Sequence, residues 1–157
     1  MCFPLLGKAQ SLQVCPQCPI STIAQAVAIA KKGDTIEVQK GTYPENNILL
    51  DNPLTLIGKG MPVINGQFKV SILKIQADSV TIKGFRLANV PFKATEEQAA
   101  ILLDKSKKFL IEDNIMDQVC FGVLLRKGRD GIIRNNKISS NAKEQYNSGN
   151  AIHLWSC

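Results

Sequence analysis

Residues 101–114, ILLDKSKKFLIEDN, recur 22 positions later as residues 123–136, VLLRKGRDGIIRNN. Each copy starts with an aliphatic run and passes a small residue, Ser106 or Gly128, that suits a tight corner. A second short aliphatic run and a final asparagine complete the unit. Repeats of this length are typical of solenoids, in which each unit buries its apolar side chains against the next. Because one turn cannot satisfy its own backbone hydrogen bonds, the sequence predicts an all-β coil of stacked parallel strands.

The register of the repeat predicts which side chains face the interior of the coil. A further copy of the aliphatic run begins at Ile152, 29 residues after Val123, and an earlier one at Leu73, 28 residues before Ile101. Stacking the copies gives two inward columns: Ile101, Val123 and Ile152 in one, and Leu103, Leu125 and Leu154 in the other. Less regular runs predict the first rungs: residues 35–38, 47–50, 54–58 and 63–66.

The asparagines that close two of these units, Asn114 and Asn136, are predicted to stack as an amide ladder inside the bend. Each side chain is expected to bond to the neighbouring turn and to satisfy backbone groups of the bend. We therefore expect a structural role for both residues and no catalytic one.

The residues between the inward columns, Leu102, Leu124 and His153, are predicted to face outward on the same strands. Two leucines and a histidine are unusual for a strand face that is exposed to water. The long connections at residues 89–100 and 139–151 leave the coil at the corner beside this face. We expect these connections to cover the face, and a partner protein is the alternative cover.

Residues 22–32 form the one segment with a convincing helical pattern. Thr22 and Gln25 fit a capping box, and a lysine pair followed by Gly33 fits the C-terminal end. An apolar stripe runs along one face: Ile23, Ala26, Val27 and Ala30. An uncovered edge of stacked strands pairs with other chains. We therefore expect this amphipathic helix to cap the exposed N-terminal edge of the first rungs.

Three segments follow from these patterns. Residues 1–11 are predicted to be the remnant of a secretory signal peptide, because a short apolar stretch precedes Gly7 and Ala9 as at a signal-peptidase site. A disordered leader is the alternative. Residues 12–33 are the N-terminal segment with its capping helix, and residues 34–157 are the β-helix rungs. Since the sequence stops inside a rung, we expect a longer natural protein, with this coil truncated at its C-terminal side.

The composition excludes two classes of protein. The longest apolar runs of the 157 residues are only a few residues long, whereas a membrane-spanning helix needs about 20. Nineteen Lys and Arg against thirteen Asp and Glu give a net charge of +6, but the lysines are scattered and aromatic residues make up only 6%. Nucleic-acid binding usually shows clustered basic residues with stacking aromatics, so a solvated lysine surface is the better interpretation.

The five cysteines include one closely spaced pair, Cys15 and Cys18, in the motif CPQC. Such a pair can be half of a metal site, a redox pair or a local disulfide. Structural zinc would need a second pair at suitable spacing, and the sequence has none. If the protein acts outside the cytoplasm, a Cys15–Cys18 disulfide could persist.

Two groups of motifs resemble known families. Residues 33–45, GDTIEVQKGTYPE, and residues 53–66, PLTLIGKGMPVING, resemble the opening of right-handed parallel β-helices of the pectate-lyase-like superfamily. Residues 79–85, SVTIKGF, and above all residues 148–155, SGNAIHLW, resemble nitrous oxide reductase maturation proteins of the NosD type. The resemblance extends from about Cys15 to Cys157.

The NosD resemblance implies a periplasmic accessory protein that is not an enzyme. It implies partnership with an ABC transporter permease–ATPase complex and a copper lipoprotein chaperone in assembling the copper–sulfur site of nitrous oxide reductase. Contact with the membrane would then come through these partners. Copper prefers imidazole and soft sulfur ligands, so we expect His153, with Cys15 and Cys18 next, to be the candidate ligands. The chain also offers Met116, Cys120 and Cys157.

Two other classes of function remain open on the same scaffold. The first is a carbohydrate-binding or polysaccharide-cleaving protein, which needs grouped carboxylates for calcium or for acid–base catalysis. The charged candidates are Asp113, Asp117, Asp130, Arg126 and Arg129, but the register groups no two acids on one strand face. The second is a purely structural surface β-helix. Because fold alone does not decide among these classes, the accessory role rests on the resemblance.

Overall fold

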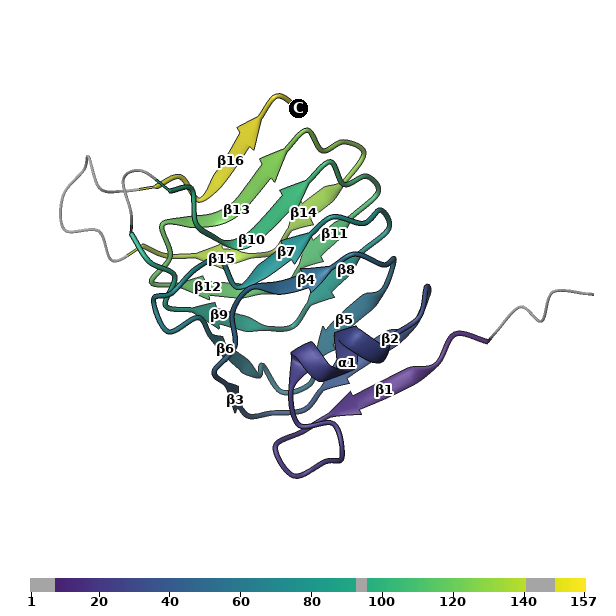
Figure 1. Ribbon diagram of the computed structural model, residues 1–157. Coiled ribbons are helices and arrows are strands. Elements are labelled where there is room, and N and C mark those ends of the chain that lie inside the picture. Colours follow the sequence, from purple (N-terminus) through teal and green to yellow (C-terminus); the bar gives the residue numbers. More distant parts are fainter. Residues whose placement is uncertain (1–7, 93–95, 141–148) are drawn as a thin grey trace, which may run out of the picture.

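Three parallel β-sheets surround a common interior in the computed structural model, which describes residues 8–92, 96–140 and 149–157 (Figure 1). Sheet A contains β1 (Ser11–Val14), β2 (Thr35–Val38), β5 (Thr55–Gly58), β8 (Thr81–Lys83), β11 (Leu110–Glu112) and β14 (Ile132–Arg134). Sheet B contains β3 (Thr42–Tyr43), β6 (Val63–Asn65), β9 (Arg86–Ala88), β12 (Ile115–Asp117) and β15 (Lys137–Ile138). Sheet C contains β4 (Ile48–Leu50), β7 (Leu73–Ile75), β10 (Ala99–Asp104), β13 (Phe121–Arg126) and β16 (Ile152–Trp155).

From β2 onward, each turn of the chain adds one strand to sheet A, then one to sheet B, then one to sheet C. Every pairing between neighbouring strands is parallel. The prediction of an all-β parallel β-helix with a single short helix near its N-terminal end is therefore confirmed.

The predicted columns of aliphatic side chains line the interior up to β13, whereas their last members, Ile152 and Leu154 on β16, keep the register but are exposed. Ile101 is in register with Leu73 and Val123, and Val123 is in register with Ile152. Ile82, Ile111 and Ile133 form a matching column in sheet A. The side chains of Leu73, Ile101, Val123, Ile82 and Ile111 are fully buried. Stacking identical short runs therefore builds one continuous core.

The corner between sheets A and B bends through residues with a left-handed backbone. Gly84, Asp113 and Asn135 follow β8, β11 and β14, and their φ angles are +79°, +57° and +54°. Glycine adopts this conformation without a steric penalty, and Asn and Asp tolerate it better than other residues. The carbonyl of Gly84 also lies so close to Gly58 on the preceding turn that a Cβ there would overlap it. Glycine at position 58 thus permits the close approach of the two turns.

The asparagine ladder lies just inside this corner. Asn114 is 1% exposed; its Nδ2 donates to the side-chain oxygen of Asn136 (3.0 Å) and to the carbonyl of Ile82 (3.1 Å). Its side-chain oxygen accepts the backbone N–H of Phe85 (3.1 Å). Asn136 repeats the pattern by donating to the carbonyl of Ile111 (2.9 Å). Each amide therefore satisfies backbone groups of the preceding turn.

Two elements cover the N-terminal end of the coil, and only one of them was predicted. Helix α1 (Ile23–Ile29) packs mainly against β4 and buries Ile23 and Ala26 in the core. The edge of β2 is instead paired by β1, in register from Ser11 to Val14. The expectation that the helix covers the whole N-terminal edge is wrong for sheet A, because an added strand satisfies the edge hydrogen bonds that a helix leaves open.

Helix α1 begins as predicted and ends earlier. Thr22 and Gln25 make both hydrogen bonds of the capping box. The predicted continuation to residue 32 is wrong, because the helix ends at Ile29 and Ala30 is extended, with ψ of 140°. The carboxylate of Asp34 accepts the N–H of Lys31 (2.8 Å) and that of Gln10 (2.8 Å). This carboxylate takes the N–H that a longer helix would have used, and it ties the loop to the start of β1.

Residues 1–7 of the predicted signal remnant lie outside the described residues. The last part of that segment has structure, since the carbonyl of Gln10 accepts the N–H of Thr35 (2.8 Å) and Ser11 is the first residue of β1. No helix in the described part of the chain is long and apolar enough to cross a membrane.

Candidate functional site

The outward face of sheet C carries the predicted row of unusual side chains. Leu102 is in register with Lys74 on one side and Leu124 on the other, and Leu124 is in register with His153. Leu102 is 8% exposed and Leu124 is fully buried. Their cover includes Phe121, which packs against them from the same sheet. The connections expected to cover this face include residues 93–95 and 141–148, which lie outside the described residues.

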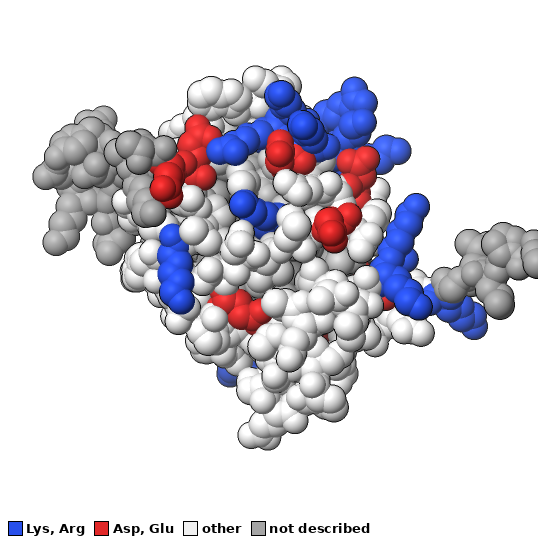
Figure 2. All heavy atoms as spheres, in the orientation of Figure 1, with Lys and Arg blue, Asp and Glu red and all other residues white. Residues whose placement is uncertain are grey.

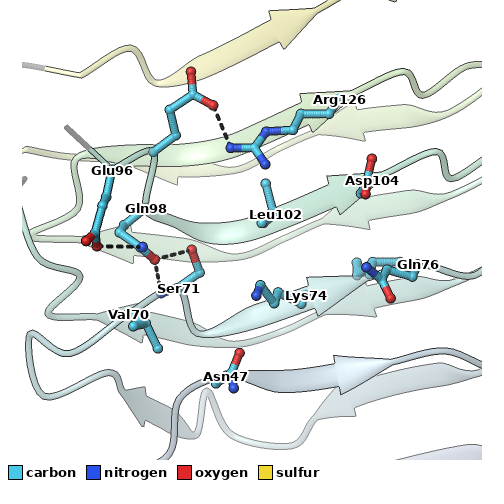
Figure 3. A pocket seen from close by; sticks show the side chains of 12 residues that line it. Asn47, Val70, Ser71, Lys74, Gln76, Glu96, Gln98, Leu102, Asp104 and Arg126 are labelled. Atoms are coloured by element: carbon cyan, nitrogen blue, oxygen red, sulfur yellow. Dashed lines mark hydrogen bonds and ion pairs between the residues drawn. The ribbon is translucent and has the colours of Figure 1, made fainter. Parts of the chain in front are cut away.

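A groove of about 830 Å³ lies over β7 and β10 on this face (Figure 3), and we call it the outer groove. Its floor is formed by the outward side chains of the two strands, and one wall is formed by residues 96–98. Prominent lining residues are Asn47, Lys74, Gln76, Leu102, Asp104 and Arg126. Amides, acids and bases outnumber apolar groups in this set, so the groove suits a polar ligand or a polar protein segment.

Hydrogen bonds fix the wall of the outer groove to β7. The side-chain oxygen of Gln98 accepts the N–H of Ser71 (2.6 Å) and its hydroxyl (2.9 Å). The hydroxyl oxygen of Ser71 in turn accepts the N–H of Ala99 (2.9 Å). Ser71 is 1% exposed, so these bonds are shielded from water. The start of β10 is therefore held at a defined position over the sheet.

An ion pair joins the same wall to β13. Glu97 Oε2, just before β10, lies 2.6 Å from a guanidinium nitrogen of Arg126 on the neighbouring strand β13. Both side chains are partly exposed, so water screens the pair. Basic and acidic side chains are interspersed over this part of the surface (Figure 2). The outer groove thus presents charges of both signs.

His153 lies beyond the groove in a small aromatic group at the C-terminal end of sheet C. Its ring centroid is 5.3 Å from that of Phe121 and 5.9 Å from that of Trp155. Its Nδ1 is 3.0 Å from the side-chain nitrogen of Asn150. The surroundings of His153 are therefore aromatic and amide groups.

The structure does not bring the three predicted copper ligands together. Cys15 and Cys18 form a disulfide in the loop between β1 and α1, whereas His153 lies on β16 at the opposite end of the coil (Figure 1). A disulfide offers no thiolate to a metal. The predicted ligand set therefore divides into an oxidised pair and a distant histidine.

The other sulfur-bearing candidates named from the sequence lie in three different settings. Met116 is fully buried in the core, Cys157 is an exposed free thiol, and Cys120 is a half-buried free thiol. Burial raises the pKa of the Cys120 thiol, which disfavours the thiolate. These residues add no donor to either candidate position.

The donor set does not fit a resident copper centre within the described part of the chain. No group of three or more His, Cys, Asp or Glu residues there could hold a metal ion. Copper sites of the electron-transfer type use two histidines, a cysteine and a weak axial ligand. The described residues therefore do not assemble a built-in copper centre.

The charged residues considered for catalysis lie apart. Asp117 on β12 pairs with Arg86 (2.6 Å) and accepts the hydroxyl of Ser139 (3.0 Å); these bonds lower the pKa of its carboxyl. Asp130 is exposed, with Arg129 as a loose partner at 3.9 Å. Asp113 occupies the corner after β11. Asp117 and Asp130 are each paired with a base, and none of these three acids lines the outer groove, whose own carboxylates are Glu96, Glu97 and Asp104.

Sequence reasoning missed the outer groove and its wall. The register did place Leu102 beside Leu124, but Ser71, Glu97 and Gln98 lie in connections outside the repeat. Their contacts depend on how an irregular connection crosses the sheet, which periodicity does not encode. The one usable signal was the length of the connection that precedes β10.

Comparison with known proteins identifies a family model and a related fold. The model described as "Periplasmic copper-binding protein (NosD)" matches residues 27–155. A search of curated proteins found no significant match. Among solved structures, a crystal structure of a pectin methylesterase mutant in complex with a hexasaccharide aligns with a TM-score of 0.59 at 15% identity. The alignment covers 82% of this chain and 55% of that one, and at this identity it shows the fold alone.

Proposed function

Because the chain belongs to the NosD family of periplasmic copper-binding proteins, we propose that it acts as an extracytoplasmic accessory protein in maturing the copper site of nitrous oxide reductase. The observation that carries this proposal is the family match, which extends over residues 27–155 and so includes almost the whole coil. Copper is the cargo of this process, and the β-helix is a scaffold on which copper-carrying partners meet.

The dispersed donors support a scaffold role over a storage role. A protein that stores copper needs several ligands within reach of one ion, and the described residues do not group them. A scaffold needs a rigid surface, and the stacked turns provide one because each strand of sheet C is hydrogen-bonded to its neighbours. We propose three partners for this surface: an ABC transporter permease–ATPase complex, a copper lipoprotein chaperone and nitrous oxide reductase itself.

The outer groove is our candidate for the partner-binding surface. It is polar, it carries charges of both signs, and its wall is fixed by the buried Ser71–Gln98 bonds. A preorganised wall lowers the entropy that binding must overcome. Lys74 lies in the floor, so a reversed charge at this position changes the groove without touching the core.

Complementation tests the proposed function. A strain that lacks its own copy of this protein is supplied with the full-length protein, and the copper content and absorption spectrum of purified nitrous oxide reductase are measured. We expect the wild type to restore the copper–sulfur site and Lys74→Glu to restore it poorly. Lys83→Glu, on sheet A, is the matched control and should restore it fully. Full maturation without any copy of the protein would contradict the proposal.

A carbohydrate-binding function is the second candidate. The supporting observation is the polar outer groove on a fold shared with a protein whose crystal structure holds a hexasaccharide. Binding of uronic-acid oligosaccharides to the full-length protein, measured by calorimetry and lost in Lys74→Glu, would favour this candidate over the accessory role.

A further inference from the structure

The loop that holds the CPQC motif is closed by its own backbone. It connects β1 to the cap of helix α1, and the N–H of Cys15 donates to the carbonyl of Ile20 (3.3 Å). The N–H of Cys18 donates to the carbonyl of Cys15 (3.0 Å), and Pro16 packs against Gly41. These contacts do not involve the sulfur atoms. The loop is therefore held by backbone and proline contacts in addition to the disulfide.

The Cys15–Cys18 disulfide closes a very short loop and should stabilise the fold less than a long-range cross-link would. In the chain-entropy account, a cross-link stabilises more as the loop that it closes grows longer, and here the two cysteines are only three positions apart. Both cysteines are partly exposed. Because both sulfur-bearing residues are partly exposed, the bond is open to reduction by a dithiol protein.

We propose that reduction of the Cys15–Cys18 disulfide creates a site for one Cu(I) ion bound by the two thiolates. The choice of copper rests on the proposed function, whereas the site itself rests on the CPQC loop. Soft thiolate ligands select Cu(I), and a two-coordinate Cu(I) ion is satisfied by two sulfurs. Zinc in a structural site requires four ligands, and the described residues group no others near this loop. Two thiolates therefore complete the coordination of Cu(I) but leave that of a structural zinc ion incomplete.

The two steps of loading balance in atoms and electrons. A thiolate of the dithiol reductant attacks one sulfur of the disulfide, and its second thiol then resolves the mixed disulfide. Two electrons and two protons pass to Cys15 and Cys18, and the reductant leaves as a disulfide. When Cu(I) binds, each cysteine loses its proton and forms one S–Cu bond, and the copper keeps its oxidation state. The disulfide therefore acts as a gate that closes the site under oxidising conditions.

Three other candidate donors in the described part of the chain lie far from this site. Cys120 lies against Gly149 near the C-terminal end of the coil, and Cys157 lies at its end. His153 lies on β16, the last strand of sheet C (Figure 1). These three residues serve as internal controls because none of them lies near the CPQC loop.

Competition for Cu(I) tests the proposal. Full-length protein is titrated without oxygen against the Cu(I) complex of bathocuproine disulfonate, and loss of the coloured complex reports transfer. We expect the reduced protein to take up a single Cu(I) ion and the oxidised protein to take up none. Cys15→Ser and Cys18→Ser should each weaken binding by about 100-fold or more, beyond the roughly 10–100-fold cost of losing a residue that only supports a ligand. Cys120→Ser and His153→Ala should bind as the wild type does.

Uptake of Cu(I) by the oxidised protein, no uptake by the reduced protein, or unchanged uptake in Cys15→Ser would each overturn the proposal. Circular dichroism of every variant checks that the coil is folded, and reduced wild type tests the site without any substitution. Complementation with the Cys15→Ser, Cys18→Ser double variant separates the two proposals. Normal maturation in that strain, together with no Cu(I) uptake by the reduced wild type in vitro, removes the copper site and leaves the accessory function standing.

Discussion

Asn114 and Asn136 lie on successive turns of the coil, and the side-chain nitrogen of the first donates to the side-chain oxygen of the second at 3.0 Å. Both residues follow a strand of sheet A, so the bond runs along the axis of the coil. Asn114 is the more buried of the two and also bonds to backbone groups of Ile82 and Phe85. The ladder therefore joins neighbouring turns at the corner where the strand hydrogen bonds are interrupted.

Replacing Asn114 by alanine should destabilise the protein by about 3 kcal/mol, because each buried polar group left unpaired costs about 1–3 kcal/mol. The carbonyl of Ile82 and the N–H of Phe85 both lose their partner. Urea unfolding followed by circular dichroism measures the loss. Asn52→Ala, at an exposed bend, is the matched control and should change stability by less than about 0.5 kcal/mol. Equal effects of the two substitutions would show that the ladder does not stabilise the coil.

The periodic part of this fold could be predicted from sequence because each turn buries aliphatic side chains at equivalent positions of the repeat. The match between residues 101–114 and 123–136 predicted the inward columns, the outward Leu102–Leu124 pair and the asparagine ladder. At the corner after β10 and β13, the left-handed residues are Lys105 and Lys127, one position before the small residues that were expected to absorb the bend. Small residues at this corner relieve crowding, whereas the backbone turn itself is made by lysines.

The N-terminal end could not be predicted in the same way, because its contacts join segments that are distant in sequence and share no repeat. Strand β1 has no periodic partner and is recognised only from its pairing with β2. Glu45 accepts the N–H groups of Ile23 and Ala24, about 20 positions earlier in the chain. The candidate site could not be predicted for the same reason. Its Glu97–Arg126 and Ser71–Gln98 contacts depend on the path of the connection that precedes β10, which follows no repeat.

Replacing Glu45 by alanine should destabilise the protein by about 1–2 kcal/mol, because helix α1 loses a carboxylate that caps two of its first N–H groups. Glu45 Oε1 lies 2.8 Å from the N–H of Ile23, and Oε2 lies 2.9 Å from that of Ala24. Thermal and urea unfolding measure the change. Glu37→Ala, which removes only a loose surface pair with Lys59 at 3.7 Å, is the control and should cost less than about 1 kcal/mol. A Glu45 variant as stable as the Glu37 variant would rule out this capping role.

The stability contributed by Asp34 should depend on pH. The N–H groups of Gln10 and Lys31 stabilise its carboxylate and lower the pKa of the carboxyl. A lowered pKa in the folded state means that the contribution is present above the unfolded value near 4 and is lost as the pH falls through the folded value. The difference in Tm between wild type and Asp34→Ala should therefore be largest near pH 7 and shrink below about pH 4. The exposed Asp51→Ala is the control. A difference that is constant from pH 7 to pH 2 would refute this role for the charge.

The full-length protein should release no methanol from methyl-esterified pectin, although its coil resembles that of a pectin methylesterase. Acid–base catalysis on a polysaccharide needs suitably placed carboxylates. Three carboxylates line the outer groove: Glu97 is paired with Arg126 at 2.6 Å, Glu96 accepts from Gln98 at 3.4 Å, and Asp104 is the acid that remains to be tested. A coupled assay for methanol, with an authentic pectin methylesterase as the positive control, measures turnover.

Activity that survives purification and disappears in Asp104→Asn, whose side chain lines the groove, would make this protein an enzyme and would contradict a purely accessory role. Activity that persists equally in Asp104→Asn and Glu97→Gln would point to a contaminating enzyme, because a reaction in the outer groove must respond to loss of the acids that line it.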